Sequence, residues 1–585
     1  MAINLLLLLL LSIFPQGRDE PKIALLRSTH TQSALPELSE WMNDNLADWE
    51  VYLLNRRLGY RVITSRELEK GIEGYDLLIL PSAICLSERE RSAIRRFLSG
   101  GGGVLATGPL GARDEQGGWQ GWEFLSSLFG VEVTGEIGPK GNVSASLTLK
   151  GNSPLSYRIP PGFRLEVTNL NEIHPLAAKV VETRASPVGY WSKPLTSNEK
   201  GCGVVCGEYY HGRFVWLGFE REAVVGVKTI QVIRDQILLN SISWLRKEPV
   251  AWLNPWPDGK RENQAAVVLI CDAEYRYTQT LNAVTVLNKE GVQGTFFLVP
   301  EEALNNPKAT RILTENGEIG LHGVEVYRWQ PYEEQLSRLK EGRESLEELT
   351  GKKIIGFHPP EELYDSSTIK ALAELGYRYL CGNDVTDRLC PLITQVRSSS
   401  LRGKGEQKPI IVVLPKGPRS DYDLLVKEHL RGTNDLFDAL KQDFLSVYEV
   451  QGAYFLLYHS HLLCAENNIP ALERFIQFCK GKDVWFATCK EMADWWQGFE
   501  NLSLTVRRAN SSLRRIEVKV TNNSQFPLKN LRLFVAPPEP VKNVSIKSRG
   551  VVAPEYELKE AGRIITFNVK SLGAYASQTY LVDCQ

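Results

Sequence analysis

Between residues 263 and 497 the sequence alternates apolar runs with helical stretches, and this alternation limits the possible folds most strongly. Eight runs of strand length recur there with helices between them: AAVVLICDAE, GVQGTFFLVP, GEIGLHG, KIIGFHPP, YRYLCGND, PIIVVLP, AYFLLYHSH and VWFATCKEM. Strands that alternate with helices form a parallel sheet, and eight such units predict a (β/α) barrel. In such barrels the chemistry gathers at the carboxyl ends of the strands.

Polar residues collect at these strand ends. They are Asp272, Glu274, His322, His358, Asp384, Asp387, His459 and His461. Four of the eight histidines of the chain are among them, a placement that scattered core histidines would not be expected to repeat. The pattern therefore predicts a functional site at one end of the barrel.

The same region resembles a polysaccharide deacetylase, the NodB-homology domain of carbohydrate esterase family four. GVQGTFFLVP is similar to the second strand of that family, ENGEIGLHG to its histidine motif and GFHPPEELYDSS to its arginine-proline motif. FLLYHSH is similar to its last catalytic strand, and VWFATCKEMADWW to its closing strand and helix. The motifs follow the order of the family, so the resemblance implies its barrel fold over residues 263–497.

The resemblance also implies a mechanism. In that family an Asp and two His hold a divalent metal, usually zinc, which polarises the acetyl carbonyl and activates a water. A second Asp takes the proton of the water, and a late His donates to the leaving amine. Carried over, Asp272 matches the catalytic base and His459 the catalytic acid. The metal Asp usually follows the base directly, but that position is Ala273; Glu274 fits a variant spacing and is the expected ligand.

The histidine motif departs from the family pattern. His322 matches its first metal ligand, but the position four residues on is Val326, which cannot bind a metal. Two substitutes stay open: Glu325, one helical turn along, or His358, which replaces the arginine of the arginine-proline motif.

Substrate binding is expected from a second group of residues. Asp384 and Asp387 form a D-x-x-D similar to the fourth family motif, and His461 would share the strand face of His459. Aromatic residues near the barrel mouth suit stacking on sugar rings or simple packing: Tyr275, Tyr277, Tyr327 and Trp329.

Two functions follow from this mixture. One is a divergent metal-dependent hydrolase, with zinc as the expected ion, that deacetylates N-acetylated amino sugars of an extracellular or cell-envelope polysaccharide. The other is a catalytically inactive carbohydrate-binding pseudoenzyme or scaffold. Asp272, His322 and His459 favour the hydrolase, whereas Ala273 and Val326 favour the scaffold.

Residues 21–250 also alternate strands and helices, which predicts a doubly wound parallel sheet. This region resembles the class I glutamine amidotransferase-like fold in its non-catalytic form, through YDLLILPSAICLSERERSAIRRFLSGGGGVLATG and HGRFVWLGFE. Active members carry a cysteine on a G-x-C-x-G elbow. No cysteine follows Gly100–Gly103, and Cys85 lacks flanking glycines, so we expect a non-catalytic domain. Ser87 is the expected N-cap of the helix that precedes the glycines.

The expected domain limits follow from these changes in the sequence pattern. The barrel is expected over residues 251–500, and an antiparallel β-sandwich over 501–585, where Ile516, Val518 and Val520 alternate with charged residues. Its expected role is that of a spacer or packing module.

Composition and the first residues limit the setting. The net charge is −1, so the chain lacks the basic field that nucleic acid requires. Residues 1–20 contain an apolar run from Leu5 to Phe14 of signal-peptide length, which predicts an extracytoplasmic protein. No later segment has the length and apolarity of a membrane span.

The ten cysteines contain no C-x-x-C pair, so a zinc ribbon is not expected. In an exported protein a disulfide could join Cys202 to Cys206 or Cys464 to Cys479, although most of the ten are expected to be buried thiols.

Overall fold

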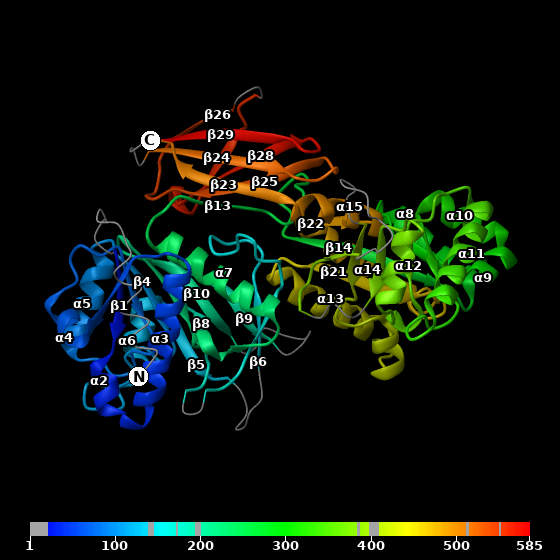
Figure 1. Cartoon of the computed structure of the whole chain (residues 1–585). Coiled ribbons are helices and arrows are strands. Elements are labelled where there is room, and N and C mark those ends of the chain that lie inside the picture. Colours follow the sequence, from blue (N-terminus) through cyan, green and yellow to red (C-terminus); the bar gives the residue numbers. More distant parts are fainter. Residues whose placement is uncertain are drawn as a thin grey trace. The chain divides into compact units, whose positions relative to one another are not determined.

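The computed structural model describes residues 22–137, 145–170, 173–192, 201–382, 387–396, 409–509, 514–548 and 552–585. The expected signal segment therefore lies outside the described residues. The chain forms two compact units, coloured along the sequence in Figure 1. Unit 1 comprises Met1–Ile137, Asn169–Pro187 and Gly203–Ala223, and unit 2 comprises Gly138–Thr168, Val188–Cys202 and Val224–Gln585.

Unit 1 contains a parallel sheet of the expected kind. Its strands run in the order β11-β4-β3-β1-β2, with β1 (Ile23–Arg27), β2 (Tyr60–Thr64), β3 (Leu77–Leu80), β4 (Gly103–Thr107) and β11 (Gly212–Leu217). Strands β3 and β4 are buried along their whole length, because helices cover both faces of such a sheet. An antiparallel extension joins β11 to β10 (Cys202–Tyr209), β8 (Leu176–Val180) and β5 (Val131–Glu136). The likeness to amidotransferases stays a prediction.

The α-helices in the described part of unit 1 are α2 (Thr29–Ala34), α3 (Ser39–Asn55), α4 (Ser65–Lys70), α5 (Glu88–Ser99) and α6 (Glu123–Phe129). Ser87 is the N-cap of α5, as predicted: its side chain accepts the Glu90 amide, and the Glu90 carboxylate accepts the Ser87 amide. This reciprocal pair is a capping box.

Unit 2 contains all eight strands expected between residues 263 and 497: β14 (Ala265–Ala273), β15 (Thr295–Leu298), β16 (Glu318–His322), β17 (Gly356–His358), β18 (Tyr379–Gly382), β20 (Ile410–Pro415), β21 (Ala453–His459) and β22 (Val484–Ala487). They are parallel in the order β20-β18-β17-β16-β15-β14-β21, with β22 beside β14. A short antiparallel strand, β19 (Leu392–Gln395), pairs with β20. Among the described residues no strand pairing joins β20 to β21, so the sheet is a half-barrel and not the closed barrel expected.

Each face of the half-barrel has its own core. The outer face packs on α8 (Thr280–Glu290), α10 (Pro307–Asn316), α11 (Tyr332–Thr350), α12 (Ser366–Glu374), α13 (Thr433–Glu449) and α14 (Ile469–Lys480), and α9 (Pro300–Asn305) lies beside α10. The inner face packs on α15 (Cys489–Glu500). Burial on both faces explains why residues 265–271 of β14, AAVVLIC, form a continuous apolar run.

Residues near the C-terminus form two antiparallel sheets of four strands. The first has the order β13-β25-β28-β27 and the second β23-β24-β29-β26: β13 (Val250–Leu253), β25 (Leu528–Ala536), β28 (Ile564–Leu572), β27 (Tyr556–Lys559), β23 (Leu502–Arg508), β24 (Arg515–Asn522), β29 (Ser577–Cys584) and β26 (Val544–Ser548). Ile516, Val518 and Val520 lie in the core that both sheets share. Strand β13 joins this sandwich from a position before the half-barrel in the sequence.

The remaining strands of unit 2 are β7 (Arg164–Val167), with β12 (Val224–Val225) on one side and β6 (Ala145–Leu149) on the other; residues 189–192 of β9 (Ala185–Ser192) pair with β6. Helix α7 (Lys228–Leu245) follows.

All ten cysteines are buried free thiols, so neither disulfide considered above is formed. Among the described residues, no helix combines the length and the apolarity needed to cross a bilayer.

The two edges of the half-barrel approach each other just beyond β20. A Cβ atom added to Gly417 would lie 2.1 Å from the carbonyl oxygen of Phe455 in β21, so only glycine permits this contact between backbones.

We therefore expect Gly417→Ala to lower the free energy of unfolding by about 1–3 kcal/mol, because the added methyl group must push away the backbone of β21 at Phe455. Urea unfolding measures the change. Gly259→Ala is the control, because its added Cβ would meet no atom closer than 3.5 Å. Equal stability of the two variants would show that the edges are not held this closely.

Candidate functional site

Strand periodicity aims four polar side chains at the inner face. In β14, Ala266, Val268 and Ile270 belong to the inner core, so Asp272 points the same way. By the same alternation Phe357 of β17 and Leu321 of β16 point outward, which turns the neighbouring His358 and His322 inward. His459 ends β21 two residues after the inward Leu457. These strands were recognised from the sequence, and their parity brings the four residues together.

Register brings the four residues to one level. His322 and His358 are direct partners in the pairing of β16 with β17, and Asp272 and His459 are direct partners in β14 and β21. Adjacent strands are about 4.8 Å apart. Two imidazoles therefore stand side by side, with their ring centroids 5.5 Å apart.

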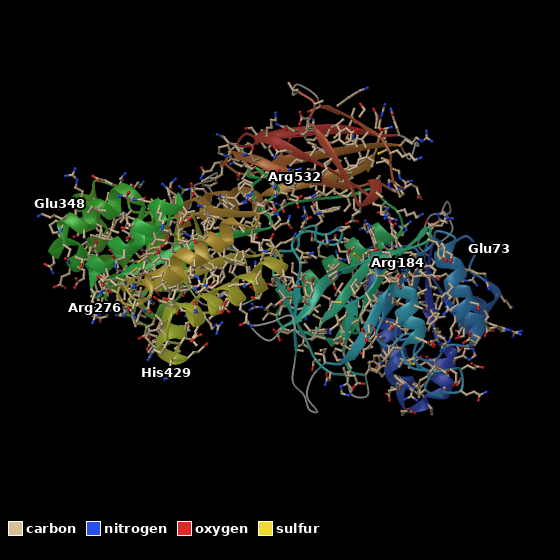
Figure 2. All side chains as sticks on the ribbon, turned by 180° about the vertical axis from the view of Figure 1, so that it is seen from behind. Glu73, Arg184, Arg276, Glu348, His429 and Arg532 are labelled. Carbon is tan, nitrogen blue, oxygen red and sulfur yellow. The ribbon has the colours of Figure 1, made fainter. Side chains whose placement is uncertain are left out.

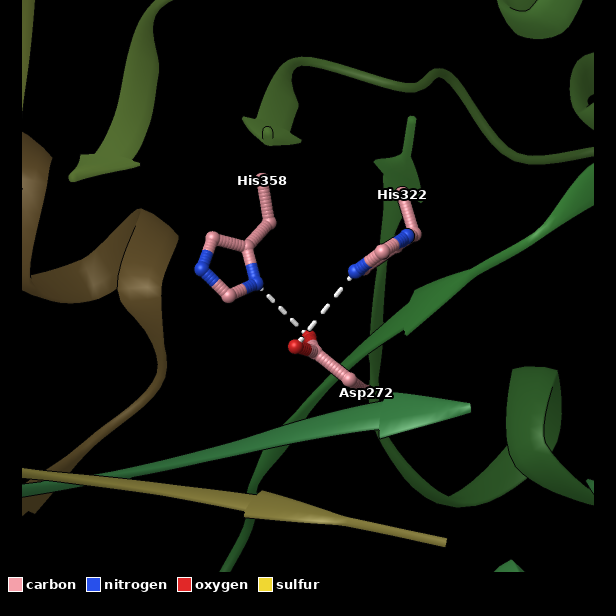
Figure 3. Close-up of side chains that lie close together, drawn as sticks. All are labelled: Asp272, His322 and His358. Atoms are coloured by element: carbon pink, nitrogen blue, oxygen red, sulfur yellow. Dashed lines mark hydrogen bonds and ion pairs between the residues drawn. The ribbon is translucent and has the colours of Figure 1, made fainter. Parts of the chain in front are cut away.

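The buried carboxylate of Asp272 is the centre of this group (Figure 3). Nδ1 of His358 lies 2.7 Å from its Oδ1, and Nε2 of His322 lies 3.4 Å from its Oδ2. Burial acts to raise the pKa of Asp272, but the charges of His358 and then His322 outweigh it and hold that pKa far below its usual range. Burial acts to lower the pKa of His322, and the Asp272 carboxylate reverses this, so the net shift is upward.

His459 approaches the same carboxylate from the other side, with Nε2 3.8 Å from Asp272 Oδ2. Its Nδ1 is bonded to Oδ1 of the fully buried Asp421 at 2.6 Å. Oδ2 of Asp421 accepts the amides of His459 and Leu463, at 2.7 and 3.0 Å. Burial acts to lower the pKa of His459, but the Asp421 carboxylate outweighs it and raises that pKa to about 10.

Asp421 was missed in the sequence, although a signal existed. It lies in the polar segment KGPRSD that directly follows the predicted strand PIIVVLP. The carboxyl end of a barrel strand is where such a residue should have been sought.

Glu274 and His461 form a second pair at the rim. Oε1 of Glu274 lies 3.7 Å from Nδ1 of His461, and the Glu274 amide donates to the Ser460 hydroxyl at 3.1 Å. The pKa of His461 is lowered by burial and by the charge of His459. The ring of Tyr275 stands edge-on to His461, with the centroids 5.5 Å apart. Glu274 thus faces His461, while its charge still acts on His322 and His459.

The other expected site residues lie elsewhere. Glu325 is exposed in the loop after β16, where it pairs with Arg338 at 2.6 Å. Asp387 pairs with Arg388, and its carbonyl accepts the amide of Arg164 in β7. Asp384 lies outside the described residues.

Asp272, His322 and His358 together could hold a metal ion. Each offers one ligand atom, these atoms all lie within 4.8 Å of one another, and all three residues are buried. One carboxylate with two imidazoles suits zinc and the neighbouring divalent transition metals. In this set His358 supplies the second imidazole, which the valine at position 326 cannot supply. The carboxylate of the set is Asp272, which was expected to be the base, and not Glu274, which was expected to be the ligand.

Residues 259–380 match the family model for polysaccharide deacetylase, so this segment is a deacetylase-type domain. It contains Asp272, His322 and His358. No curated protein sequence matches the chain.

The solved structures that match about two fifths of the chain include three of low sequence identity. A putative polysaccharide deacetylase from Mycobacterium smegmatis is 22% identical, with 41% of this chain and 91% of that chain covered and a TM-score of 0.36. A probable polysaccharide deacetylase from Pseudomonas aeruginosa PAO1 is 20% identical, with coverages of 40% and 91% and a TM-score of 0.34. A CE4 family pseudoenzyme from Bacillus anthracis is 15% identical, with coverages of 39% and 66% and a TM-score of 0.29.

Removing Asp421 should destabilise the protein. We expect Asp421→Ala to lower the free energy of unfolding by about 3–5 kcal/mol, because it leaves a buried imidazolium and two amides without their acceptor. Asp438→Ala is the control, because Asp438 is exposed on α13.

The loss should depend on pH in a defined direction. The raised pKa of His459 means that the contribution of the pair is fully present below about pH 6.5, the ordinary histidine value. That contribution is lost as the pH rises through about 10, the pKa in the folded protein. The difference between Asp421→Ala and the unchanged chain should therefore shrink between these two pH values in urea unfolding; a constant difference would contradict the pairing.

Proposed function

We propose that the half-barrel is a metal-dependent deacetylase-type hydrolase that removes acetyl groups from N-acetylated amino sugars of a polysaccharide. One observation carries the proposal: a buried Asp272 is faced by His358, His322 and His459. Asp272, His322 and His358 lie in the segment that matches the deacetylase family, and His459 follows it in the sequence. Export directed by residues 1–20 would place the reaction outside the cytoplasm.

The hydrogen bonds of His322 support a cation at this place. Its Nδ1 lies 2.6 Å from the carbonyl oxygen of Gly323, which can only accept, so Nδ1 carries a proton and donates it. In the neutral ring the lone pair of Nε2 is then directed at the carboxylate of Asp272, and this repulsion is removed either by a proton on Nε2, which the raised pKa of His322 favours, or by a metal cation between the two groups. Asp272, His322 and His358 would hold the ion. A bound divalent cation supplies Lewis-acid polarisation of an amide carbonyl and a lowered pKa for water.

The remaining side chains move the protons. His459 is held by Asp421 at Nδ1, so its other nitrogen is oriented into the site as the acid for the leaving amine. A pKa of about 10 keeps it charged at neutral pH. Glu274, two residues after Asp272, is a partly exposed carboxylate at this end of the half-barrel, whereas Asp421 is buried and bonded to His459. We assign Glu274 as the acceptor of the water proton. The roles first expected for Asp272 and Glu274 are thereby exchanged.

Two aromatic residues suit the binding of sugar rings. Tyr275, after β14, and Trp329, after β16, are 71% and 77% exposed, whereas Tyr277 and Tyr327 are buried in the core. Beside Tyr275, Arg276 is also exposed, and its side chain is labelled in Figure 2. Trp329 has a φ of 73°, a conformation that is rare for a bulky residue, and its amide donates to Asp365 at 2.9 Å. Such strain at an exposed aromatic favours a binding role over a packing role.

Metal content and activity test the proposal together. We expect His322→Ala to hold one divalent ion fewer per chain than the unchanged protein after dialysis against zinc, measured by elemental analysis. Acetate release from N-acetylglucosamine oligosaccharides should fall at least a hundredfold. The control is His429→Asn, an exposed histidine of the same unit (Figure 2), where asparagine tolerates the positive φ of 56°.

An unchanged ion count in His322→Ala would contradict the metal site. Together with retained binding of the oligosaccharide, it would leave the half-barrel as a carbohydrate-binding scaffold.

The aromatic residues give a separate prediction. We expect Trp329→Ala to raise the KM for the oligosaccharide about tenfold while kcat changes little, because stacking on a sugar contributes on the order of 1 kcal/mol to ground state and transition state alike. Tyr556→Ala is the control, since that exposed aromatic lies in β27 of the sandwich. Equal KM values would exclude Trp329 from the binding surface.

A further inference from the structure

A second cluster of metal-ligating side chains lies in unit 1, apart from the deacetylase-type domain. It consists of His30 in α2, Glu69 in α4 and Glu90 in α5, whose ligand atoms lie within 4.8 Å of one another. We propose that these three residues bind a divalent transition-metal cation of the zinc class.

Topology places the cluster where doubly wound sheets bind ligands. The strand order β4-β3-β1-β2 means that the chain leaves β1 for β2 on one side and then crosses to β3 on the other. The segments after β1 and β3 therefore diverge at this point, and such a switch point opens a crevice at the carboxyl ends of the strands. His30 follows β1, and Glu90 follows β3. Glu69 comes from the helix after β2, so three separate connections converge on one place.

The distances fit a shared ion better than hydrogen bonds. Nε2 of His30 lies 3.6 Å from Oε1 of Glu69 and 3.8 Å from Oε2 of Glu90. Both are too long for a hydrogen bond. Ligands about 2.1 Å from a common zinc ion lie roughly 3.4 Å apart in a tetrahedral site, so a small inward movement would complete the coordination.

Glu90 brings a buried carboxylate that its surroundings do not fully satisfy. Its Oε2 accepts the Ser87 amide at 2.9 Å within the capping box, but its buried Oε1 has no hydrogen-bond partner of ordinary geometry. Burial raises the pKa of Glu90, partly offset by the Ser87 amide and the Ser65 hydroxyl. A cation would compensate the buried charge.

Capping of α5 alone does not account for the cluster. The capping box needs only Ser87 and Glu90, yet the Ser87 hydroxyl also lies 2.6 Å from Oε1 of Glu69. His30 belongs to neither the capping box of α4 nor that of α5. Its amide nitrogen lies 3.5 Å from the Ser65 hydroxyl oxygen, and the amide nitrogen of Thr29 lies 3.1 Å from the same oxygen. The side chains of His30 and Glu69 are 31% and 20% exposed, so an ion could enter from solvent. Three protein ligands at a partly open surface leave a position for water or a small ligand.

Zinc stoichiometry of the full chain tests the proposal. The unchanged protein, His30→Ala, Glu69→Gln and the control His211→Ala are each dialysed against micromolar zinc and measured by elemental analysis. His211 is an exposed histidine of the same unit outside the cluster. We expect one ion fewer per chain in His30→Ala and in Glu69→Gln, and no loss in the control. If His30→Ala fails to fold, Glu69→Gln decides, because its amide oxygen can still accept the Ser87 hydroxyl.

The same measurement in the His322→Ala background separates this site from the one in unit 2. The decrease caused by His30→Ala should be the same in both backgrounds. If unit 1 binds an ion but the half-barrel does not, His322→Ala leaves the zinc content unchanged, while His30→Ala still lowers it by one ion per chain. Equal zinc content in His30→Ala, Glu69→Gln and His211→Ala would overturn the proposal.

Discussion

The buried carboxylate of Asp272 determines which side chains must surround it at this end of the half-barrel. Removing a carboxylate from water costs several kcal/mol unless opposite charge and hydrogen bonds surround it. Here the compensation comes from His358, His322 and His459, which reach the carboxylate from three different strands. The strands must therefore keep their register, because a slip of one residue would turn each imidazole to the outer, apolar face.

Sheet curvature completes this arrangement. The outermost parallel strands, β20 and β21, are far apart in the strand order, yet Asp421 beyond β20 holds His459 at the end of β21. The close approach at Gly417 allows this contact between the two edges. The orientation of His459, the proposed acid, thus depends on a glycine four residues before Asp421 and on the bend of the sheet.

Much of this site could be predicted from the sequence, because strand periodicity is local information. The eight apolar runs predicted the strands, and Asp272, His322, His358 and His459 were expected at their carboxyl ends. Strand alternation then explains why all four side chains point inward. Contacts across strands could not be predicted in this way. His358 and Asp272 are 86 residues apart, and the sequence spacing contains nothing that brings Nδ1 to within 2.7 Å of Oδ1.

The spacing of residues in the sequence predicted side-chain positions least well where a regular helix or strand was assumed. Glu325 was expected one helical turn beyond His322, but residues 323–331 form an irregular loop in which Glu325 turns to Arg338. Likewise, no local pattern showed that β13 belongs to the sandwich, since its partner β25 follows almost 300 residues later. Both cases depend on tertiary packing, which overrides local propensity.

The pair His322 and His358 shows how a fold can bring together a set of possible metal ligands although a sequence motif is incomplete. Two imidazoles can face one ion from positions i and i+4 of a turn, where the Cβ atoms are about 5–6 Å apart. They can also face it from register partners on adjacent parallel strands, which are about 4.8 Å apart. Val326 removes the first arrangement, and the pairing of β16 with β17 supplies the second. A missing motif histidine is therefore weak evidence that a site has decayed. The donors that the fold brings together decide whether an ion can bind, and here they are one carboxylate and two imidazoles.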